Sequence, residues 1–294
     1  IIISGCGKIG ATILENLVAE GHDIVAIDNS QNVIQEVTNV YDVMGVCGNC
    51  FDSDILEEAG ISEADLFIAA AGSDESNMMS CFLARKLGAK HTIARIRNPE
   101  YNDKSLGLLR HYFELSLSIN PERLAAHEIF NILKFPSAVK IDSFSRRNFE
   151  MIELRLKNDS VLDGLKLSEI REKYKTQVLF CCVQRGNEVY IPDGNFVLKS
   201  GDKVGLTATH TEISKLFKAI GLAQKQCKNV MLLGGSRIAY YLSEMLTNTG
   251  ISVKIIDRNE ANCELLADLL PKAIIINADG TQQEVLEEEG LDRT

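Results

Sequence analysis

Six residues near the start of the chain have the types and spacing of a phosphate-binding turn. The segment "IIISGCGKIG" joins an apolar run, typical of a buried parallel strand, to Gly5-Cys6-Gly7-Lys8-Ile9-Gly10. In a G-x-G-x-x-G turn the glycines give a tight bend, a close approach of the backbone to a pyrophosphate, and close packing of helix on strand. The N–H groups that open the following helix favour an anion at the same place. The spacing therefore predicts a cradle for a phosphate-bearing ligand.

A carboxylate follows at the distance that such a site requires. The apolar strand in "HDIVAIDNS" ends on Asp28, which lies roughly 20 residues beyond the turn, as in dinucleotide-binding units. A carboxylate at this point accepts hydrogen bonds from ribose hydroxyls and repels a 2′-phosphate. Together the two features predict a nucleotide site, with a strand-helix-strand unit that binds nothing as the alternative.

The elements that must position these residues alternate between strand and helix. Further apolar strands are expected in "YDVMGVCGN", "ADLFIAAAG" (ending at Gly72), "KHTIARIRN" and "FELSLSI", and helices in "SQNVIQEVTNV", "DSDILEEAGI", "SDESNMMSCFLARKLG" and from Pro121 to Leu133. This alternation predicts an α/β fold with a doubly wound, parallel, Rossmann-like sheet. Ligands of such sheets lie beyond the carboxyl ends of the strands. The residues expected around one nucleotide there are Asp28, Gly48, Asn49, Ala71, Gly72 and Arg95.

The pattern changes near Pro136. Alternating polar and apolar residues with turn signals, in "VKIDSFSRRNFEMIELRLKNDS" and "QVLFCCVQRGNEVYIPDGNFVLKSGDKVGLTA", predict strands of a small α+β domain. Its helices are expected in "KLSEIREKY" and "TEISKLFKAIG", and "LAQKQCK" is expected to be a polar linker. The predicted domains are therefore residues 1–136, 137–222 and 223–294.

The opening pattern then returns. "NVMLLGGSRIAYYLSEMLTNTGISVKIIDRNEANCELLADL" repeats the first segment, so that Gly5 matches Gly234 and Asp28 matches Asp257. A repeat on this scale indicates a duplicated domain, here the start of a second Rossmann-like domain. The copy reaches Thr294 before its fourth strand. We therefore expect the natural protein to continue for about another domain's worth of residues.

Composition excludes several classes of partner. A net charge of −10 argues against nucleic acid and against anionic lipid as direct partners. A hydrophobic content of 45% supports real cores, and no apolar run approaches the roughly 20 residues of a membrane span. Eight irregularly spaced cysteines are typical of reduced thiols in a cytoplasmic protein.

Catalysis and metal binding find little support in the residue pattern. Cys47 and Cys50 form a C-x-x-C without a second pair or a nearby histidine, so we expect neither a metal nor a redox role for them. The five histidines are scattered, and no proton-transfer group is evident for an NAD-dependent oxidoreductase, which remains the alternative function. A nucleotide-sensing repressor would need a basic recognition helix, and none stands out.

The remaining class is a binding module whose conformation reports a nucleotide, and here the sequence resembles a known family. The strings "AAAGSDESNMMSCFLAR" and "ARIRNPEY", followed by "LDGLKLSEI" and "GNEVYIPDGNFVLKSGDKV" and then a second cradle, closely resemble the TrkA family. These are the regulatory subunits of bacterial and archaeal Trk potassium uptake systems, built from RCK (also called KTN) domains. The resemblance covers essentially the whole chain.

The resemblance implies a cytoplasmic regulatory subunit without enzymatic activity. Such a subunit lies at the inner face of the cell membrane through its partner, the membrane potassium-translocating subunit of the Trk type. It forms a homo-oligomer (dimer or tetramer) and binds NAD(H), or alternatively ATP/ADP or another adenine nucleotide. The binding residues implied in the first domain are Gly5, Cys6, Gly7, Lys8, Ile9, Asp28, Ala71, Gly72 and Arg95. Those implied in the second are Gly234, Gly235, Ser236, Arg237, Ile238 and Asp257.

Two details qualify the resemblance. Ser236 replaces the second glycine of the turn and Ala239 the third, so we expect a weak or empty second site. The helix from Pro121 to Leu133 is expected to bury an apolar face against a partner subunit, with packing inside its own domain as the alternative. That face consists of Leu124, Ile129, Phe130, Ile132 and Leu133.

Overall fold

The computed structural model describes residues 1–101, 103–134, 140–144, 149–222 and 227–294. It divides into two compact units, Ile1–Leu124 and Ala125–Thr294, which are described here one at a time. The domain boundary predicted at residue 136 and most of the predicted linker (residues 223–226) lie outside the described residues.

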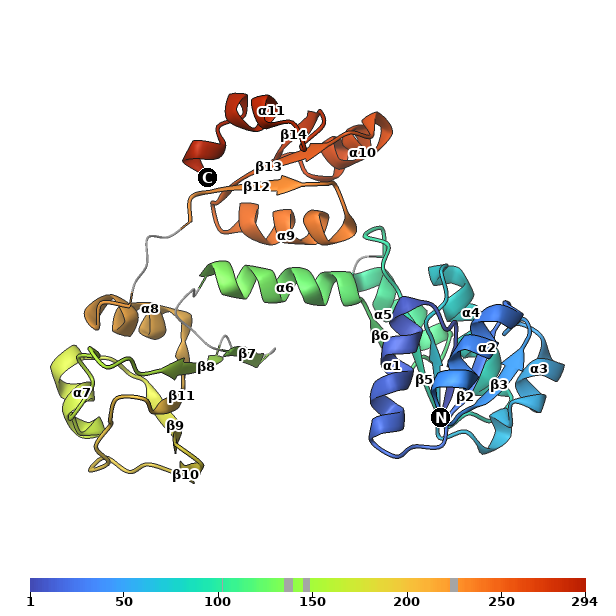
Figure 1. Ribbon diagram of the computed structural model, residues 1–294, viewed down its shortest axis with the longest axis horizontal. Coiled ribbons are helices and arrows are strands. Elements are labelled where there is room, and N and C mark those ends of the chain that lie inside the picture. The colour runs from blue at the N-terminus through green and yellow to red at the C-terminus, as the bar shows by residue number, and fades with distance from the viewer. Residues whose placement is uncertain (102, 135–139, 145–148, 223–226) are drawn as a thin grey trace. The chain divides into compact units, whose positions relative to one another are not determined.

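The first unit contains a parallel sheet of six strands (Figure 1). The strand order is β3-β2-β1-β4-β5-β6, which is the order of a dinucleotide-binding sheet and confirms the predicted fold class. The order reverses between β1 and β4, so ligands are expected beyond the carboxyl ends of these two strands. The strands are β1 (Ile2–Ser4), β2 (Val25–Asp28), β3 (Met44–Cys47), β4 (Leu66–Ala69), β5 (His91–Arg95) and β6 (Leu117–Ile119).

Helices connect these strands. They are α1 (Lys8–Ala19), α2 (Gln31–Val40), α3 (Ser53–Glu58), the 3-10 turn η1 (Ile61–Glu63), α4 (Asp74–Lys86) and α5 (Asp103–Tyr112). Two details differ from the sequence analysis. The fourth strand ends at Ala69 rather than at Gly72, because Ala71 and Gly72 belong to the turn that opens α4. Helix α5 was not anticipated.

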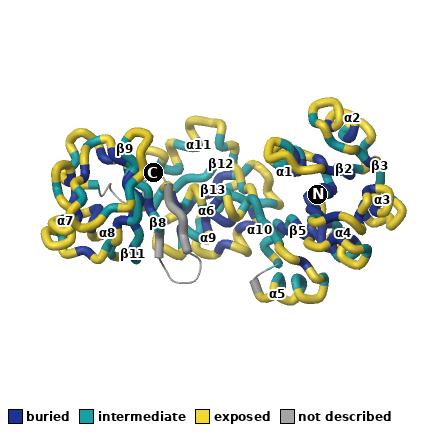
Figure 2. The backbone as a smooth tube through the Cα atoms, turned by 90° about the horizontal axis from the view of Figure 1, so that it is seen from below, coloured by how far each residue is buried: buried dark blue, intermediate teal, exposed yellow. Residues whose placement is uncertain are grey.

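Both faces of this sheet are covered, which explains the nearly continuous apolar runs of its strands. Ile2 and Phe67 contribute to one core, together with Leu56 of α3. Ile3 contributes to the core on the other face, together with Leu14 of α1. Figure 2 shows the strands largely buried, with the outer faces of α2 and α3 exposed.

The second unit contains an antiparallel sheet of five strands in the order β10-β9-β11-β8-β7. Arg185 donates to both carboxylate oxygens of the buried Asp202 at 2.8 Å, which joins β9 to the turn before β11. The elements are β7 (Lys140–Phe144), β8 (Phe149–Arg155), α7 (Leu167–Tyr174), β9 (Leu179–Arg185), β10 (Glu188–Tyr190), β11 (Lys203–Thr209) and α8 (His210–Ala219). This is the predicted small α+β fold.

The second unit also contains a three-stranded parallel sheet in the order β12-β13-β14. It has the strand and helix order of the opening segment, as the internal repeat predicted. Its elements are β12 (Asn229–Leu233), α9 (Arg237–Asn248), β13 (Ser252–Asp257), α10 (Glu260–Leu269), β14 (Ile274–Asn277), α11 (Gln283–Glu288) and the 3-10 turn η2 (Leu291–Arg293).

Helix α6 (Pro121–Lys134) divides its apolar residues between two surroundings. Ala126, Phe130 and Leu133 pack with Tyr241 and Leu242 of α9. The other apolar side chains of α6 remain accessible: Leu124 is 62%, Ile129 39% and Ile132 64% exposed. One side of the helix therefore packs inside the chain, and the expectation of a partner subunit now concerns only the other side. No helix in the described parts of the chain has the length and apolar character needed to cross a membrane.

Candidate functional site

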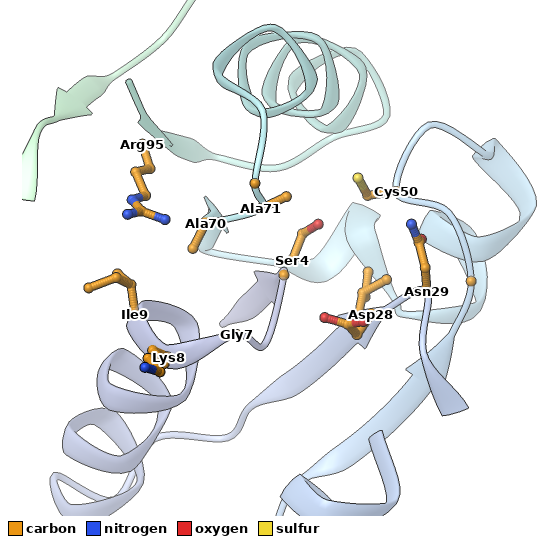
Figure 3. A pocket seen from close by; sticks show the side chains of 14 residues that line it. Ser4, Gly7, Lys8, Ile9, Asp28, Asn29, Cys50, Ala70, Ala71 and Arg95 are labelled. Carbon is orange, nitrogen blue, oxygen red and sulfur yellow. The ribbon is translucent and has the colours of Figure 1, made fainter. Parts of the chain in front are cut away.

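A cavity of about 590 Å³ opens at the carboxyl ends of the strands in the first unit. Figure 3 shows Asp28 and Asn29 on one side of it and Arg95 with Ile9 on the other. The predicted residues that line it are Gly5, Gly7, Lys8, Ile9, Asp28, Gly48, Ala71, Gly72 and Arg95. Five lining residues were not predicted: Ser4, Ile27, Asn29, Cys50 and Ala70. Cys6 and Asn49 were predicted around the nucleotide and do not line the cavity.

The three glycines of the first turn serve different purposes. Gly5 has φ +85°, and a Cβ on it would lie 2.6 Å from the backbone nitrogen of Ala71. A Cβ on Gly10 would lie 1.9 Å from the carbonyl oxygen of Gly5, so both glycines are required by packing. A Cβ on Gly7 would meet no atom within 4 Å. Gly7 therefore leaves space on the side of the cavity where a phosphate would approach.

The start of α1 carries donors that suit an anion. Gly7 is the residue before the first turn of α1 and supplies no side-chain hydrogen bond to it. The first N–H groups of a helix have no partner within the helix, and the helix dipole favours negative charge beside them. The side chain of Lys8 adds a cation to the lining of the cavity.

Asp28 is held by two backbone donors. The N–H of Cys6 donates to its Oδ2 at 2.8 Å and the N–H of Ser30 to its Oδ1 at 2.9 Å. A carboxylate has about four acceptor positions, two on each oxygen. With two used inside the described part of the chain, each oxygen keeps one position for a ribose diol.

The Cys6 thiol is buried beside the site. Desolvation by burial, and then the charge of Asp28, raise its pKa to about 12. The thiol therefore stays protonated at neutral pH and is a poor nucleophile. The backbone of Cys6, rather than its side chain, serves the site.

Asn77 fixes the opposite wall of the cavity, and the sequence analysis assigned it no role. This fully buried side chain accepts from the N–H of Ala71 at 2.8 Å and donates to the carbonyl oxygens of Ala71 at 3.1 Å and Arg95 at 2.9 Å. It thereby joins the ends of β4 and β5. The string "SDESN" was the available signal, because it placed an asparagine one turn into the helix that follows β4.

Two of the strings that carry the family resemblance, "SDESN" (residues 73–77) and "RNPEY" (residues 97–101), contact each other. Asp74 accepts from the N–H groups of Arg97 and Asn98, both at 2.7 Å. The hydroxyl of Tyr101 donates to Glu75 at 2.7 Å. This bond is the main reason that the pKa of Glu75 falls to about 2 and that of Tyr101 rises to about 12. The start of α4 thus holds the segment after β5, beside the cavity wall that contains Gly72 and Arg95.

Arg95 connects the cavity to the start of α6. Its Nη2 donates to Oε1 of Glu122 at 2.8 Å, and the two side chains are 12% and 19% exposed. The Nε of Arg95 and Oε2 of Glu122 are buried without a hydrogen-bond partner in the described residues. The ion pair is therefore incompletely bonded, next to the place predicted for the ligand.

The second turn has the same backbone arrangement. Gly234 has φ +93°, the N–H of Gly235 donates to Oδ2 of Asp257 at 2.6 Å, and the N–H of Asn259 donates to its Oδ1 at 2.8 Å. The hydroxyl of Ser236 accepts from the N–H of Ala239 at 3.2 Å and so caps α9. The other predicted residues, Arg237 and Ile238, form the first turn of that helix.

The C-x-x-C cysteines lie near the cavity. Cys47 is exposed, Cys50 is buried, and Cys50 is part of the cavity lining. Among the described residues, no group of three or more His, Cys, Asp or Glu side chains is arranged to hold a metal ion. That these cysteines stay reduced and metal-free remains a prediction.

Comparison with known proteins gives one consistent answer. The TrkA-N domain family matches residues 1–109 and 230–294, and the TrkA-C domain family matches residues 151–221. The Trk system potassium uptake protein TrkA of Vibrio alginolyticus is 30% identical over 296 residues, covering 100% of this chain and 64% of that protein. A TrkA homolog of Archaeoglobus fulgidus is 31% identical, with 100% of this chain and 66% of that protein covered.

Solved structures agree on the fold. The GsuK channel superposes with a TM-score of 0.71 at 20% identity, covering 100% of this chain and 51% of that one. A GsuK channel bound to NAD superposes with a TM-score of 0.69 at 19% identity, covering 100% and 51%. The chain spans about 64% of the length of the TrkA protein of Vibrio alginolyticus. The domains matched in order, and the relatives aligned over the full chain, show that the chain belongs to the TrkA family of potassium uptake proteins.

Proposed function

We propose that this chain senses a nucleotide for a Trk-type potassium uptake system. The first cradle binds NAD(H), or alternatively ATP/ADP or another adenine nucleotide. The bound nucleotide changes the conformation of the subunit, and this change gates the membrane potassium-translocating partner. Because the aligned relatives are longer than this chain, the activity of the whole protein is part of the proposal.

The observation that carries the proposal is the matched set of groups around one cavity. The uncapped start of α1 and Lys8 suit phosphates, and Asp28 keeps an acceptor position on each oxygen for a ribose. A volume of about 590 Å³ is within the range of small-molecule and cofactor sites. Gly7 leaves the approach to the helix start open.

The Arg95–Glu122 pair offers a route from the ligand to the rest of the chain. Arg95 lines the cavity, and Glu122 lies in the first turn of α6. A nucleotide phosphate near Arg95 competes with Glu122 for the guanidinium, so the start of α6 is bonded differently with and without ligand. A ligand shifts such an equilibrium only by its differential affinity for the two states. Glu122→Gln should therefore weaken the conformational response to ligand more than it weakens binding.

We propose a homo-oligomer (dimer or tetramer) that associates through apolar surface including the exposed side of α6. Leu124, Ile129 and Ile132 form that side. The assembly is cytoplasmic and lies at the inner face of the cell membrane through its potassium-translocating partner. No nucleic acid is expected as a partner, because the net charge is −10.

Calorimetric titration tests the nucleotide site. NAD, NADH, ADP and ATP should be titrated into the purified chain, into Asp28→Ala, and into the exposed carboxylate control Asp42→Ala. Loss of hydrogen bonds to a charged acceptor costs about 1.5–3 kcal/mol, so Asp28→Ala should weaken binding at least about tenfold and Asp42→Ala should not. NADPH should bind much more weakly than NADH, since Asp28 repels the 2′-phosphate. Equal affinity for NADH and NADPH would remove the assignment.

We also expect the chain to bind the dinucleotide without turning it over. None of the described residues that line the cavity is a histidine, the commonest proton-transfer group beside a nicotinamide. Steady oxidation of NADH with a small carbonyl substrate, abolished by one side-chain substitution, would favour the oxidoreductase alternative instead.

A further inference from the structure

The second cradle contains a side-chain amide that has no counterpart in the first. Nδ2 of Asn262 donates to the carbonyl oxygen of Gly235 at 3.0 Å and to Oδ2 of Asp257 at 3.1 Å. Both partners are acceptors, which fixes the orientation of the amide and uses both of its hydrogens. The equivalent position in the first cradle is Val33, one turn into α2. A valine offers no such bond.

This amide uses an acceptor position that Asp28 retains. Oδ2 of Asp257 already accepts from the N–H of Gly235 at 2.6 Å, so the Asn262 bond completes its two positions. Oδ1 accepts from the N–H of Asn259 at 2.8 Å. Among the described residues Asp28 has the two backbone bonds and no third. A ribose diol that bonds both oxygens therefore fits Asp28 and competes with Asn262 at Asp257.

The neighbouring position has changed in a compensating way. A Cβ on Gly235 would lie 2.5 Å from Nδ2 of Asn262 and 2.5 Å from Cδ1 of Leu266. In the first cradle this position is Cys6, whose side chain is buried in the core that also contains Val37 and the half-buried Val33. Glycine at 235 makes room for the amide, and cysteine at 6 fills the same room where the amide is absent.

The start of α9, the helix of the second cradle, is also capped by a side chain of the protein itself. The hydroxyl of Ser236 accepts from the N–H of Ala239 at 3.2 Å, whereas Gly7 supplies no such cap to α1. A phosphate at the second cradle would displace this hydroxyl. The anion position and the ribose position are thus both bonded internally.

From these contacts we infer that Asn262 acts as a built-in substitute for the ribose and keeps the second cradle closed to adenine nucleotides. The inference rests on the proposed function of the first cradle, since it assigns the sensing of nucleotide in this chain to that cradle alone. Removing the amide leaves Asp257 with the two backbone bonds that Asp28 has, so the opened cradle should still fold.

The first test counts nucleotide sites by calorimetry with ADP and NADH. The wild-type chain should bind at one site, and Asn262→Val should add a second, bound at least about tenfold more tightly than any second site of the wild type. Asn262→Val/Asp257→Ala should return to one site. Asn262→Ala is the second opening variant if valine disturbs packing. The inference is overturned if both folded opening variants retain the wild-type stoichiometry and affinities.

The second test introduces the equivalent asparagine amide into the first cradle. Cys6→Gly/Val33→Asn should weaken binding at the first site about tenfold, because the new amide competes for Asp28. Cys6→Gly alone is the matched control against which this loss is measured. Equal affinity of the folded double variant and its control would overturn the inference. The proposed function fails on a different result, namely Asp28→Ala binding as tightly as wild type.

Discussion

At the ends of β1 and β12 the chain builds the same turn twice, with different residues around it. In the first copy Gly7 has no side chain, and Asp28 is held by two backbone N–H groups. In the second copy Ser236 caps its own helix, and Asn262 bonds Asp257. The glycine turn and the carboxylate predict only the backbone geometry of a cradle. Whether its donors and acceptors are available to a ligand depends on residues outside the motif.

The largest expected difference between the copies concerns the third glycine position. Gly10→Ala should destabilise the first unit by about 3 kcal/mol, the upper part of the range for overpacking, because the new Cβ would lie 1.9 Å from the carbonyl oxygen of Gly5. The higher helix propensity of alanine, about 1 kcal/mol, is too small to offset this. Ala239→Gly, the matched change in the second copy, should cost only about 1 kcal/mol. Denaturant unfolding measures both, and equal costs would contradict the packing argument.

Removal of Asp257 should mainly lower stability, whereas removal of Asp28 should mainly lower nucleotide affinity. Asp257→Ala leaves the N–H groups of Gly235 and Asn259 and the amide of Asn262 without their acceptor. It should therefore lower the free energy of unfolding by about 2 kcal/mol. Asp28→Ala removes two bonds, so it should cost less stability and far more nucleotide affinity. Thermal unfolding measures the stability of both variants, and calorimetry measures their nucleotide affinity. A larger stability loss in Asp28→Ala than in Asp257→Ala would contradict this prediction.

The parts that the sequence predicted are those set by local pattern. The buried parallel strands, the glycine turns at 5 and 234 and the carboxylates at the ends of β2 and β13 follow from residue type and spacing. Helix α5 was missed because "DKSLGLLRHY" contains an internal glycine and an irregular apolar pattern. The end of β4 was placed three residues too late. The apolar residues of "AAAG" are compatible both with a strand and with the turn that follows it, so the pattern does not mark the boundary.

The candidate site was less accessible to sequence reasoning, because its supports are long-range. Asn77 bonds the backbone of Arg95 from 18 residues away, and Arg95 pairs with Glu122 from 27 residues away. No periodicity encodes such contacts. Asn262 was overlooked for a related reason. Asn262 lies in the first turn of α10, outside the glycine and carboxylate positions that the two copies share.

A smaller effect is expected from exchanging the residue before the helix. Gly7→Ser should fold normally, because Gly7 has φ −65° and a Cβ there meets no atom within 4 Å. The new hydroxyl can cap α1 as Ser236 caps α9, so stability should be unchanged or higher by a few tenths of a kcal/mol. Nucleotide affinity should nevertheless fall about tenfold, since the hydroxyl occupies the phosphate approach and competes for the helix N–H groups.

The reverse substitution, Ser236→Gly, should cost only a few tenths of a kcal/mol in unfolding free energy. Calorimetry and thermal unfolding on the two variants provide the comparison. If Gly7→Ser binds nucleotide as tightly as wild type, the helix start is not where the phosphate lies.

The smallest effect is a pH dependence that arises at Asp257 in the second copy. Hydrogen bonds from the N–H groups of Asn259 and Gly235, and then from Asn262, lower the pKa of Asp257 below its usual 3.8. A carboxyl group with a lowered native pKa contributes stability that is present above its unfolded pKa and lost as pH falls through the native one. Asn262→Val removes one of these bonds, so the native pKa should move back toward 3.8.

Two measurements follow from that shift. Carboxyl carbon NMR should report a higher pKa for Asp257 in Asn262→Val than in wild type. The difference in unfolding free energy between the two proteins should be constant at neutral pH and should narrow below about pH 4, where the native Asp257 of the variant begins to protonate before that of the wild type. Asp257→Asn, which cannot titrate, is the control and should remove the narrowing. A gap that persists undiminished to the acid limit of folding would mean that Asn262 acts through Gly235 alone, and that Asp257 in the second copy is as available as Asp28 in the first.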